Sequence, residues 1–219
     1  MAITFDAQSA SAYSSTTTLT WSHICTGSDR LLVAGIYAGA DSTMSVTYGG
    51  VSMTQINRLL MTGAAAGQYI YLFYLLSPAT GANNVVSTSG TAVGMYGAGS
   101  SYAGAKQSAQ PDASATQATA TSQTTLTTSL TTVADNCWVV GHAYSGNAVT
   151  AGTNTTLRTG SVTALRMLDT NAAQTPAGSH SIQTTQTPAE FIGHCIASFA
   201  PIVSTTTKFN SNLSMLNVG

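Results

Sequence analysis

The most restrictive feature of the sequence is an unbroken apolar and aromatic run, Tyr69–Leu76, in a chain otherwise rich in Thr, Ser, Ala and Gly. A membrane-spanning helix needs about 20 apolar residues, so this run is too short to cross a bilayer as a helix. Its composition and the Gly and Pro residues that flank it predict a β-strand buried on both faces. Such a strand needs cover on two sides, which predicts two sheets packed face to face with this strand in the middle of one of them. Because side chains alternate along a strand, we expect two opposite faces: Tyr71, Phe73 and Leu75 on one, and Ile70, Leu72 and Tyr74 on the other.

Composition narrows the class of protein further. The chain has 219 residues, of which 43% are hydrophobic, and this is enough for one sizeable core. Charged residues make up only 6%, whereas ordinary soluble domains carry about 25%. A net charge of −1 gives little repulsion between copies, so we expect association with copies of itself or with other subunits. Nucleic acid is a disfavoured partner, because the cations form no basic stripe: Arg30, Arg58, Lys106, Arg158, Arg166 and Lys208.

Alternating segments bounded by turn residues predict further strands. Residues 16–25 alternate polar and apolar positions and residues 30–37 are strongly apolar, so we expect these two segments to form a hairpin. Residues 44–48 and 51–56 flank Gly49 and Gly50, which predict a tight turn or a bulge. No segment has the periodicity of a helix. The remaining strands are expected at residues 85–89, 93–102, 124–132, 137–144 and 191–200.

The second half of the sequence repeats patterns of the first, which indicates an internal duplication. The matching segments are residues 31–37 with 137–144, 46–49 with 149–152, 77–81 with 175–178, and 94–103 with 191–200.

From these patterns we predict an all-β fold, a jelly-roll-like antiparallel β-sandwich with two pseudo-repeated halves. A single domain is expected over residues 1–202, with halves at about 1–103 and 123–202. Residues 103–123 lack large apolar side chains and predict a surface connection between the halves. Two separate small domains are the alternative, but each would have a thin core. Residues 203–219 are expected to form a C-terminal arm.

A series of short motifs resembles a module of bacteria and phages whose usual pattern runs TWSHT, GSNRLLVVGV, VTYGGVALT and LWYL followed by Pro. The corresponding residues here are Leu19-Thr20-Trp21-Ser22-His23, Gly27-Ser28-Asp29-Arg30-Leu31-Leu32-Val33, Val46-Thr47-Tyr48-Gly49-Gly50-Val51, Leu72-Phe73-Tyr74-Leu75 and Pro78. The resemblance covers residues 16–201 and implies a lectin-like or jelly-roll β-sandwich of secreted bacterial proteins and phage structural proteins, generally without an established activity. It supplies no catalytic residues. Such modules often precede further domains or an anchor, whereas this chain stops after a short arm, which favours a standalone virion component.

Titratable residues follow no catalytic or metal-binding pattern. Glycoside hydrolysis needs two carboxylates across one cleft, and the acids here fall mainly in turns, with Asp29 and Asp135 at equivalent turn positions in the two halves. His142 and His194 lie in apolar segments, which favours hydrogen-bonded core histidines over metal ligands. The three isolated cysteines predict buried free thiols rather than a disulfide: Cys25, Cys137 and Cys195. We therefore expect neither a metal nor a cofactor, and a glycan-active enzyme remains only as a third, weaker hypothesis.

Two groups of residues suggest binding. Tyrosines can stack on sugar rings, although core packing explains them equally well; the candidates are Tyr37, Tyr48, Tyr96 and Tyr144. The C-terminal arm has little charge and several apolar side chains, which predict docking on a neighbouring subunit: Phe209, Leu213, Met215, Leu216 and Val218.

The expected function is that of a non-enzymatic phage structural protein, a capsid decoration or other accessory virion subunit. The first residues lack the charged start and apolar core of a signal peptide, which favours synthesis in the host cytoplasm and a place in the virion. Its partners would be other virion proteins and copies of itself, with no nucleic acid and no membrane. The alternative is a carbohydrate-binding or adhesive β-sandwich module of a bacterial surface protein, with a glycan as its partner.

Overall fold

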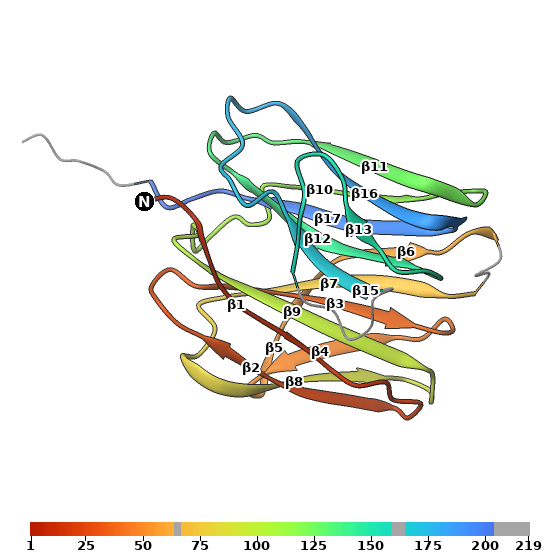
Figure 1. Cartoon of the computed structure of the whole chain (residues 1–219). Coiled ribbons are helices and arrows are strands. Elements are labelled where there is room, and N and C mark those ends of the chain that lie inside the picture. The colour runs from red at the N-terminus through yellow and green to blue at the C-terminus, as the bar shows by residue number, and fades with distance from the viewer. Residues whose placement is uncertain (64–66, 159–164, 204–219) are drawn as a thin grey trace, which may run out of the picture.

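The computed structural model describes residues 1–63, 67–158 and 165–203, and the regular elements within them are antiparallel β-strands, β1 to β17 (Figure 1). These strands form four sheets. Two sheets belong to residues 1–103 and two to residues 113–199, so the chain consists of two sandwich-like halves. This arrangement confirms the all-β antiparallel sandwich that the sequence predicts.

The first half contains a five-stranded sheet and a four-stranded sheet. The five-stranded sheet has the order β1 (Thr4–Ala10), β9 (Met95–Ala103), β3 (Leu31–Ala38), β7 (Tyr69–Leu76) and β6 (Thr54–Leu60). The four-stranded sheet has the order β2 (Thr18–Cys25), β8 (Gly81–Ser89), β4 (Met44–Tyr48) and β5 (Val51–Ser52).

The second half contains a five-stranded sheet and a three-stranded sheet. The five-stranded sheet has the order β10 (Ala113–Ala118), β17 (Ile192–Phe199), β12 (Trp138–Ser145), β15 (Leu165–Asp169) and β14 (Thr156–Leu157). The three-stranded sheet has the order β11 (Gln123–Thr131), β16 (Ser179–Glu190) and β13 (Thr150–Ala151).

The two halves have the same topology. In the order of strands across each sheet, β1, β9, β3, β7 and β6 of the first half correspond to β10, β17, β12, β15 and β14 of the second, and β2, β8 and β4 correspond to β11, β16 and β13. Only the short strand β5 has no counterpart in the described part of the second half. The internal duplication inferred from the sequence is therefore present in the fold.

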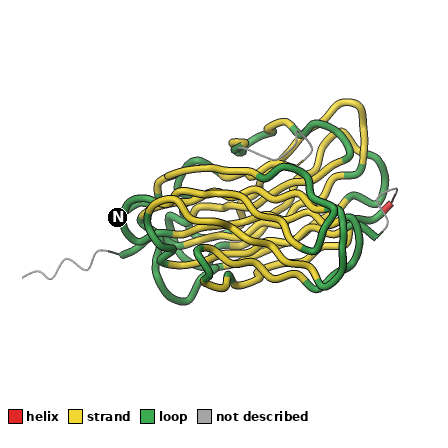
Figure 2. Tube along the Cα trace, turned by 90° about the horizontal axis from the view of Figure 1, so that it is seen from below, coloured by secondary structure: helices red, strands yellow, loops and turns green. Residues whose placement is uncertain are grey.

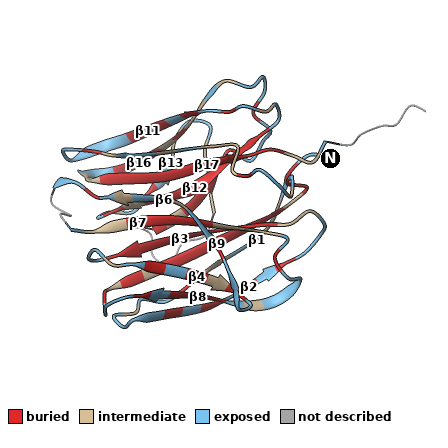
Figure 3. Cartoon of the chain, turned by 180° about the vertical axis from the view of Figure 1, so that it is seen from behind, coloured by how far each residue is buried: buried red, intermediate tan, exposed pale blue. Residues whose placement is uncertain are grey.

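The four sheets stack in layers, with the two five-stranded sheets in the middle and the smaller sheets outside (Figure 1). Each half has its own core between its two sheets. A third apolar cluster lies between the halves and contains Leu31, Val33 and Leu72 of the first with Val140 and Phe199 of the second. Figure 3 accordingly shows buried residues along the inner strands and exposed ones on the outer sheets. The strands run along the length of the molecule, so its loops gather at two ends (Figure 2).

The run Tyr69–Leu76 is strand β7, and its two faces point into different cores as predicted. Ile70 and Leu72 belong to the cluster between the halves, whereas Tyr71 and Phe73 belong to the core of the first half. Its predicted place in the middle of the sheet is wrong. The middle strand is β3, which is buried at every position, and β7 lies between β3 and β6.

The predicted hairpin of residues 16–25 and 30–37 is also wrong. Strand β2 pairs with β8, whereas β3 pairs with β7 and β9 of the other sheet. The burial patterns explain the separation, because β2 alternates exposed and buried residues and β3 is buried throughout. A strand with one solvent-exposed face belongs in an outer layer, and a strand buried on both faces belongs in an inner layer. The turn between them carries the chain from one sheet to the other.

The segment 103–123 is not only a surface connection, since it contains strand β10. This strand pairs with β17 at the edge of its sheet. Alanine is depleted in strands, so composition predicts no strand here, but Ala113 and Ala115 pack against the core of the second half. The expected C-terminal arm begins at Val203, and its remaining residues lie outside the described part of the chain.

Candidate functional site

Four tyrosines line a surface groove at one end of the molecule, which we call the tyrosine groove: Tyr13, Tyr37, Tyr96 and Tyr144. Tyr37 lies in β3, Tyr96 opposite it in β9, and Tyr144 in β12 of the second half. Tyr13 comes from the loop between β1 and β2. The groove has a volume of about 520 Å³, and small residues complete its walls: Gly39, Ala40, Ala92, Val93 and Gly94.

The four rings form a continuous series of contacts. Tyr37 and Tyr144 stack with their centroids 4.1 Å apart and an interplanar angle of 22°. Tyr96 contacts Tyr37 at 5.8 Å and Tyr13 at 5.0 Å. The rings differ in exposure, because Tyr37 is 7% exposed and Tyr13 is 55% exposed. Tyr37 is thus an internal support, and Tyr13 is the ring most open to a ligand.

The groove is neutral. Burial raises the pKa of Tyr37, and it raises that of Tyr144 further, helped by hydrogen bonding with Tyr37. Both hydroxyls therefore stay protonated at ordinary pH and can donate and accept hydrogen bonds. None of the described residues that line the groove is charged.

Three of the tyrosines suggested by the sequence thus lie together, and the fourth lies elsewhere. Tyr48 is 1% exposed in the core of the first half, and its hydroxyl donates to the carbonyl oxygen of Gly81 at 3.0 Å. Its ring has no face free for a sugar, which removes it from the candidates. Sequence reasoning missed Tyr13, although an aromatic residue in a Ser-rich stretch outside any apolar run is a signal of a surface ring.

A second pocket adjoins the tyrosine groove through the loop after β3. Gly39 and Ala40 line the groove, and the next residue, Asp41, lines the second pocket together with Gln55 and Arg58. Arg58 pairs with Asp41, and its guanidinium lies 4.2 Å from the ring centroid of Tyr69. The Arg58 and Asp41 side chains are 40% and 61% exposed, so their remaining hydrogen-bonding atoms are accessible to a ligand.

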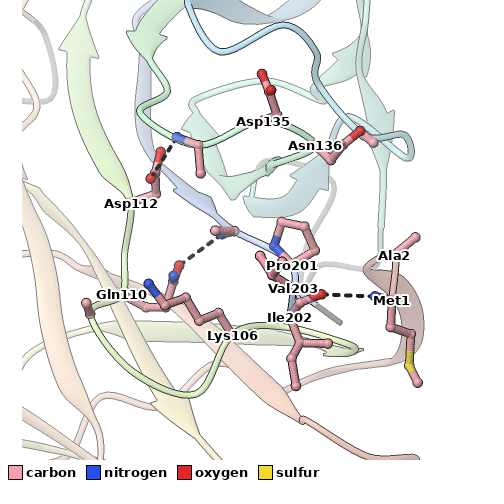
Figure 4. Close-up of a pocket in the computed structure, with 14 residues that line it drawn as sticks. Met1, Ala2, Lys106, Gln110, Asp112, Asp135, Asn136, Pro201, Ile202 and Val203 are labelled. Atoms are coloured by element: carbon pink, nitrogen blue, oxygen red, sulfur yellow. Dashed lines mark hydrogen bonds between the residues drawn. The ribbon is translucent and has the colours of Figure 1, made fainter. Parts of the chain in front are cut away.

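A cavity of about 730 Å³ lies at the opposite end, which we call the terminal pocket (Figure 4). The amino group of Met1 donates to the carbonyl oxygen of Ile202 at 2.9 Å. Nearby, the side-chain oxygen of Gln110 accepts the backbone N–H of Ala200 at 3.0 Å. The wall is largely apolar but includes three charged residues, Lys106, Asp112 and Asp135. The N-terminus and the last described residue, Val203, therefore lie at the same end of the sandwich.

Two acids at equivalent positions in the two halves form a repeated structural clamp. Asp6 accepts the backbone N–H of Thr26 and the hydroxyl of Ser101, both at 2.8 Å. Asp112 accepts the N–H of Val133 at 2.7 Å and the hydroxyl of Ser198 at 3.3 Å.

These contacts are equivalent, because Ala7 and Ala113, which follow the two acids, pair with Ser101 and Ser198. Asp6 lies within β1 and is an exception to the expectation that the acids fall mainly in turns. The predicted equivalence of Asp29 and Asp135 is shifted by one residue, since Asn136 shares the positive φ of Asp29, 61° and 50°.

A third acid, Asp169, is fully buried at the end of β15 and is an exception to the expectation that the acids fall mainly in turns. It receives two hydrogen bonds from Arg158, at 2.8 and 3.1 Å, and one from the hydroxyl of Tyr102 at 2.8 Å. The guanidinium also lies 3.9 Å from the ring centroid of Phe5. Because Tyr102 and Phe5 belong to the other half, this cluster joins the two halves.

His142, His194 and the three cysteines lie in the cores, as the sequence predicts. His194 contacts the hydroxyls of Thr128 and Thr184 at 3.0 and 2.7 Å, whereas neither ring nitrogen of His142 has a hydrogen-bond partner in the described chain, contrary to expectation. Burial lowers the pKa of each to about 3. Cys25, Cys137 and Cys195 are buried free thiols. Burial, and secondarily Asp112, raises the pKa of Cys137 to about 12, so this thiol is unreactive.

Among the described residues, no three of His, Cys, Asp and Glu lie close enough together to hold a metal ion. In the same part of the chain, no helix is long and apolar enough to cross a membrane. Comparison with protein-family models, curated proteins and solved structures finds no match. The class established is therefore that of an all-β protein of antiparallel sheets with a duplicated sandwich, and the family suggested by the sequence motifs remains an expectation.

Proposed function

We propose that this chain is a non-enzymatic structural subunit of a phage particle, a capsid decoration or other accessory virion protein that acts through protein–protein assembly. One observation carries the proposal. Met1 and Ile202 lie together at one end of the sandwich beside the terminal pocket, and the chain continues from there past Val203. A subunit attached at this end would present the tyrosine groove at its far end.

The composition supports attachment through the C-terminal residues. Phe209, Leu213, Leu216 and Val218 would each contribute roughly 1.5 to 3 kcal/mol if fully buried against a partner. With 6% charged residues in the whole chain, little electrostatic repulsion opposes contact between subunits. The proposed partners are therefore other virion proteins and copies of the same chain, and the proposed location is the virion.

The test compares the full chain with two variants, one ending at Val203 and one that keeps its length but carries Ser at Phe209, Leu213, Met215, Leu216 and Val218. We expect both variants to melt like the full chain, since the sandwich is intact, but to show weaker self-association by sedimentation and lower occupancy in purified particles of the encoding phage. The variant Tyr13→Ala, altered at the far end, is the control and should assemble normally. Unchanged assembly of both tail variants would contradict the proposal.

A second candidate function is a carbohydrate-binding or adhesive module of a bacterial surface protein, and the tyrosine groove favours it. Mass spectrometry of purified phage particles and of the bacterial surface fraction separates the two candidates, because each predicts the chain in a different fraction.

A further inference from the structure

We propose that the tyrosine groove is a saccharide-binding site in which a neutral sugar ring stacks on Tyr13. This activity goes beyond the proposed role in assembly. It does not depend on how the opposite end of the molecule is attached, and it applies equally to a subunit of a particle and to a surface module.

The first argument is the way in which Tyr13 is held. Its ring is 55% exposed, yet it is supported by Tyr96, with ring centroids 5.0 Å apart. On another side it lies directly over Gly94, where an added Cβ would come within 2.6 Å of the Tyr13 hydroxyl oxygen. An exposed aromatic ring that is already fixed in place loses little conformational entropy on binding. Its electron-rich face attracts the positively polarised C–H groups of a sugar ring.

The second argument is the chemical character of the groove. Tyr37 and Tyr144 contribute hydroxyls that burial keeps protonated, and such groups can both donate to and accept from sugar hydroxyls. The described lining contains no charged side chain, so an anionic sugar would find no counter-charge there. The volume of about 520 Å³ lies within the range of small-molecule sites, roughly 300 to 1,000 Å³.

The adjoining pocket extends the same chemistry. Ala40 lines the groove and the consecutive residue Asp41 lines the second pocket with Gln55 and Arg58. Carboxylate, amide and guanidinium groups hydrogen-bond readily to hydroxyls. A saccharide longer than one ring can therefore stack in the groove and reach these planar polar groups across the loop, which favours an oligosaccharide over a monosaccharide.

The experiment screens the full chain against an array of neutral gluco-, manno- and galacto-oligosaccharides, with sulfated and sialylated glycans and a proline decapeptide alongside. The strongest binder is then titrated by calorimetry. We expect a neutral oligosaccharide to bind, and Tyr13→Ala to weaken it roughly tenfold or more, as truncation of a central aromatic contact does. Tyr13→Phe keeps the ring and should bind within a few-fold of the original.

Two glycine variants separate stacking from general damage to the fold. Gly94→Ala should displace the Tyr13 ring and weaken binding without removing any aromatic atom. Gly90→Ala is the matched control, because the nearest atom to its new Cβ would be 3.8 Å away, and it should bind normally. Thermal melting checks that all four variants remain folded.

The proposal is overturned if no neutral saccharide binds, if Tyr13→Ala and Gly94→Ala bind as well as the original chain, or if only anionic glycans or the proline peptide bind. Failure of this proposal is distinguishable from failure of the proposed assembly. The array measures saccharide binding in the groove, whereas sedimentation and particle occupancy measure assembly through the opposite end of the molecule.

Discussion

Gly35 and His142 hold the same place in the equivalent strands β3 and β12, and they face each other between the two halves. A Cβ on Gly35 would lie 2.5 Å from Cγ of His142, so the imidazole fits only because its counterpart has no side chain. Tyr37 and Tyr144 are also at matching places in these strands, but here both side chains are kept and the rings stack. The duplicated halves thus pack through pairs of equivalent residues, one pair complementary in size and the other a pair of stacked rings.

The buried histidines predict a loss of stability in acid. His142 and His194 have a pKa of about 3 in the folded protein against 6.5 when unfolded, so below pH 6.5 the unfolded chain binds protons that the folded chain does not. Stability therefore falls as the pH drops from 6.5 toward 3. Between pH 7.5 and 4.5, each histidine should remove about 2 to 3 kcal/mol from the free energy of unfolding.

The measurement is urea unfolding at both pH values for the original chain and for His194→Gln. Between the two pH values, the free energy of unfolding of the variant should fall by about 2 to 3 kcal/mol less than that of the original chain, because the variant lacks one buried histidine. This difference does not depend on the absolute stability of the variant. An identical pH dependence in both proteins would refute the assignment.

Phe73 provides a test of the core of the first half. It is 2% exposed, and its truncation in Phe73→Ala should lower the free energy of unfolding by about 3 to 5 kcal/mol, through lost burial and the cavity left behind. Ile24, which is 50% exposed, is the control, and Ile24→Ala should change stability by less than about 1 kcal/mol. Denaturant titration gives both values; similar small losses would show that β7 is not packed as described.

At the scale of elements, the sequence predicted those strands whose burial is visible in their own composition. The alternation in β2 and the continuous apolar run of β7 both correspond to observed strands. Strand β10 cannot be recognised from the sequence because its residues are small and polar, and it is a strand only through its pairing with β17. The partner of a strand is equally hidden, because hydrogen bonding between distant segments leaves no local pattern, and this is why β2 and β3 were wrongly paired.

The buried cluster around Asp169 predicts how strongly the halves depend on each other. Asp169→Ala would leave Arg158 without its carboxylate and the Tyr102 hydroxyl without an acceptor, so we expect a loss of about 3 to 5 kcal/mol. Asp41→Ala breaks an ion pair whose side chains are 40% and 61% exposed, and it should cost less than about 1 kcal/mol. Denaturant unfolding of both variants gives the comparison, and equal losses would contradict a joining role for Asp169.

At the scale of the whole molecule, the candidate site could be predicted only in part. Tyr37, Tyr96 and Tyr144 could be named as candidates from the sequence, but their meeting depends on how one half packs against the other. Tyr13 joins them through a loop whose course is set by the layers beneath it. The polar cluster between the halves had no sequence signal for the same reason, since Asp169 and Tyr102 are brought together across the interface.

The hydrogen bond between Met1 and Ile202 would allow the two halves to follow each other in either order along the chain. Because the two ends of the sandwich chain touch, a short peptide could join them, and new ends could be opened in the segment between β9 and β10. The resulting circular permutant would begin with the second half and finish with the first while keeping every strand pairing. Lys106 also lines the terminal pocket. New chain ends opened beside it would therefore lie at the same end of the molecule as the original N-terminus.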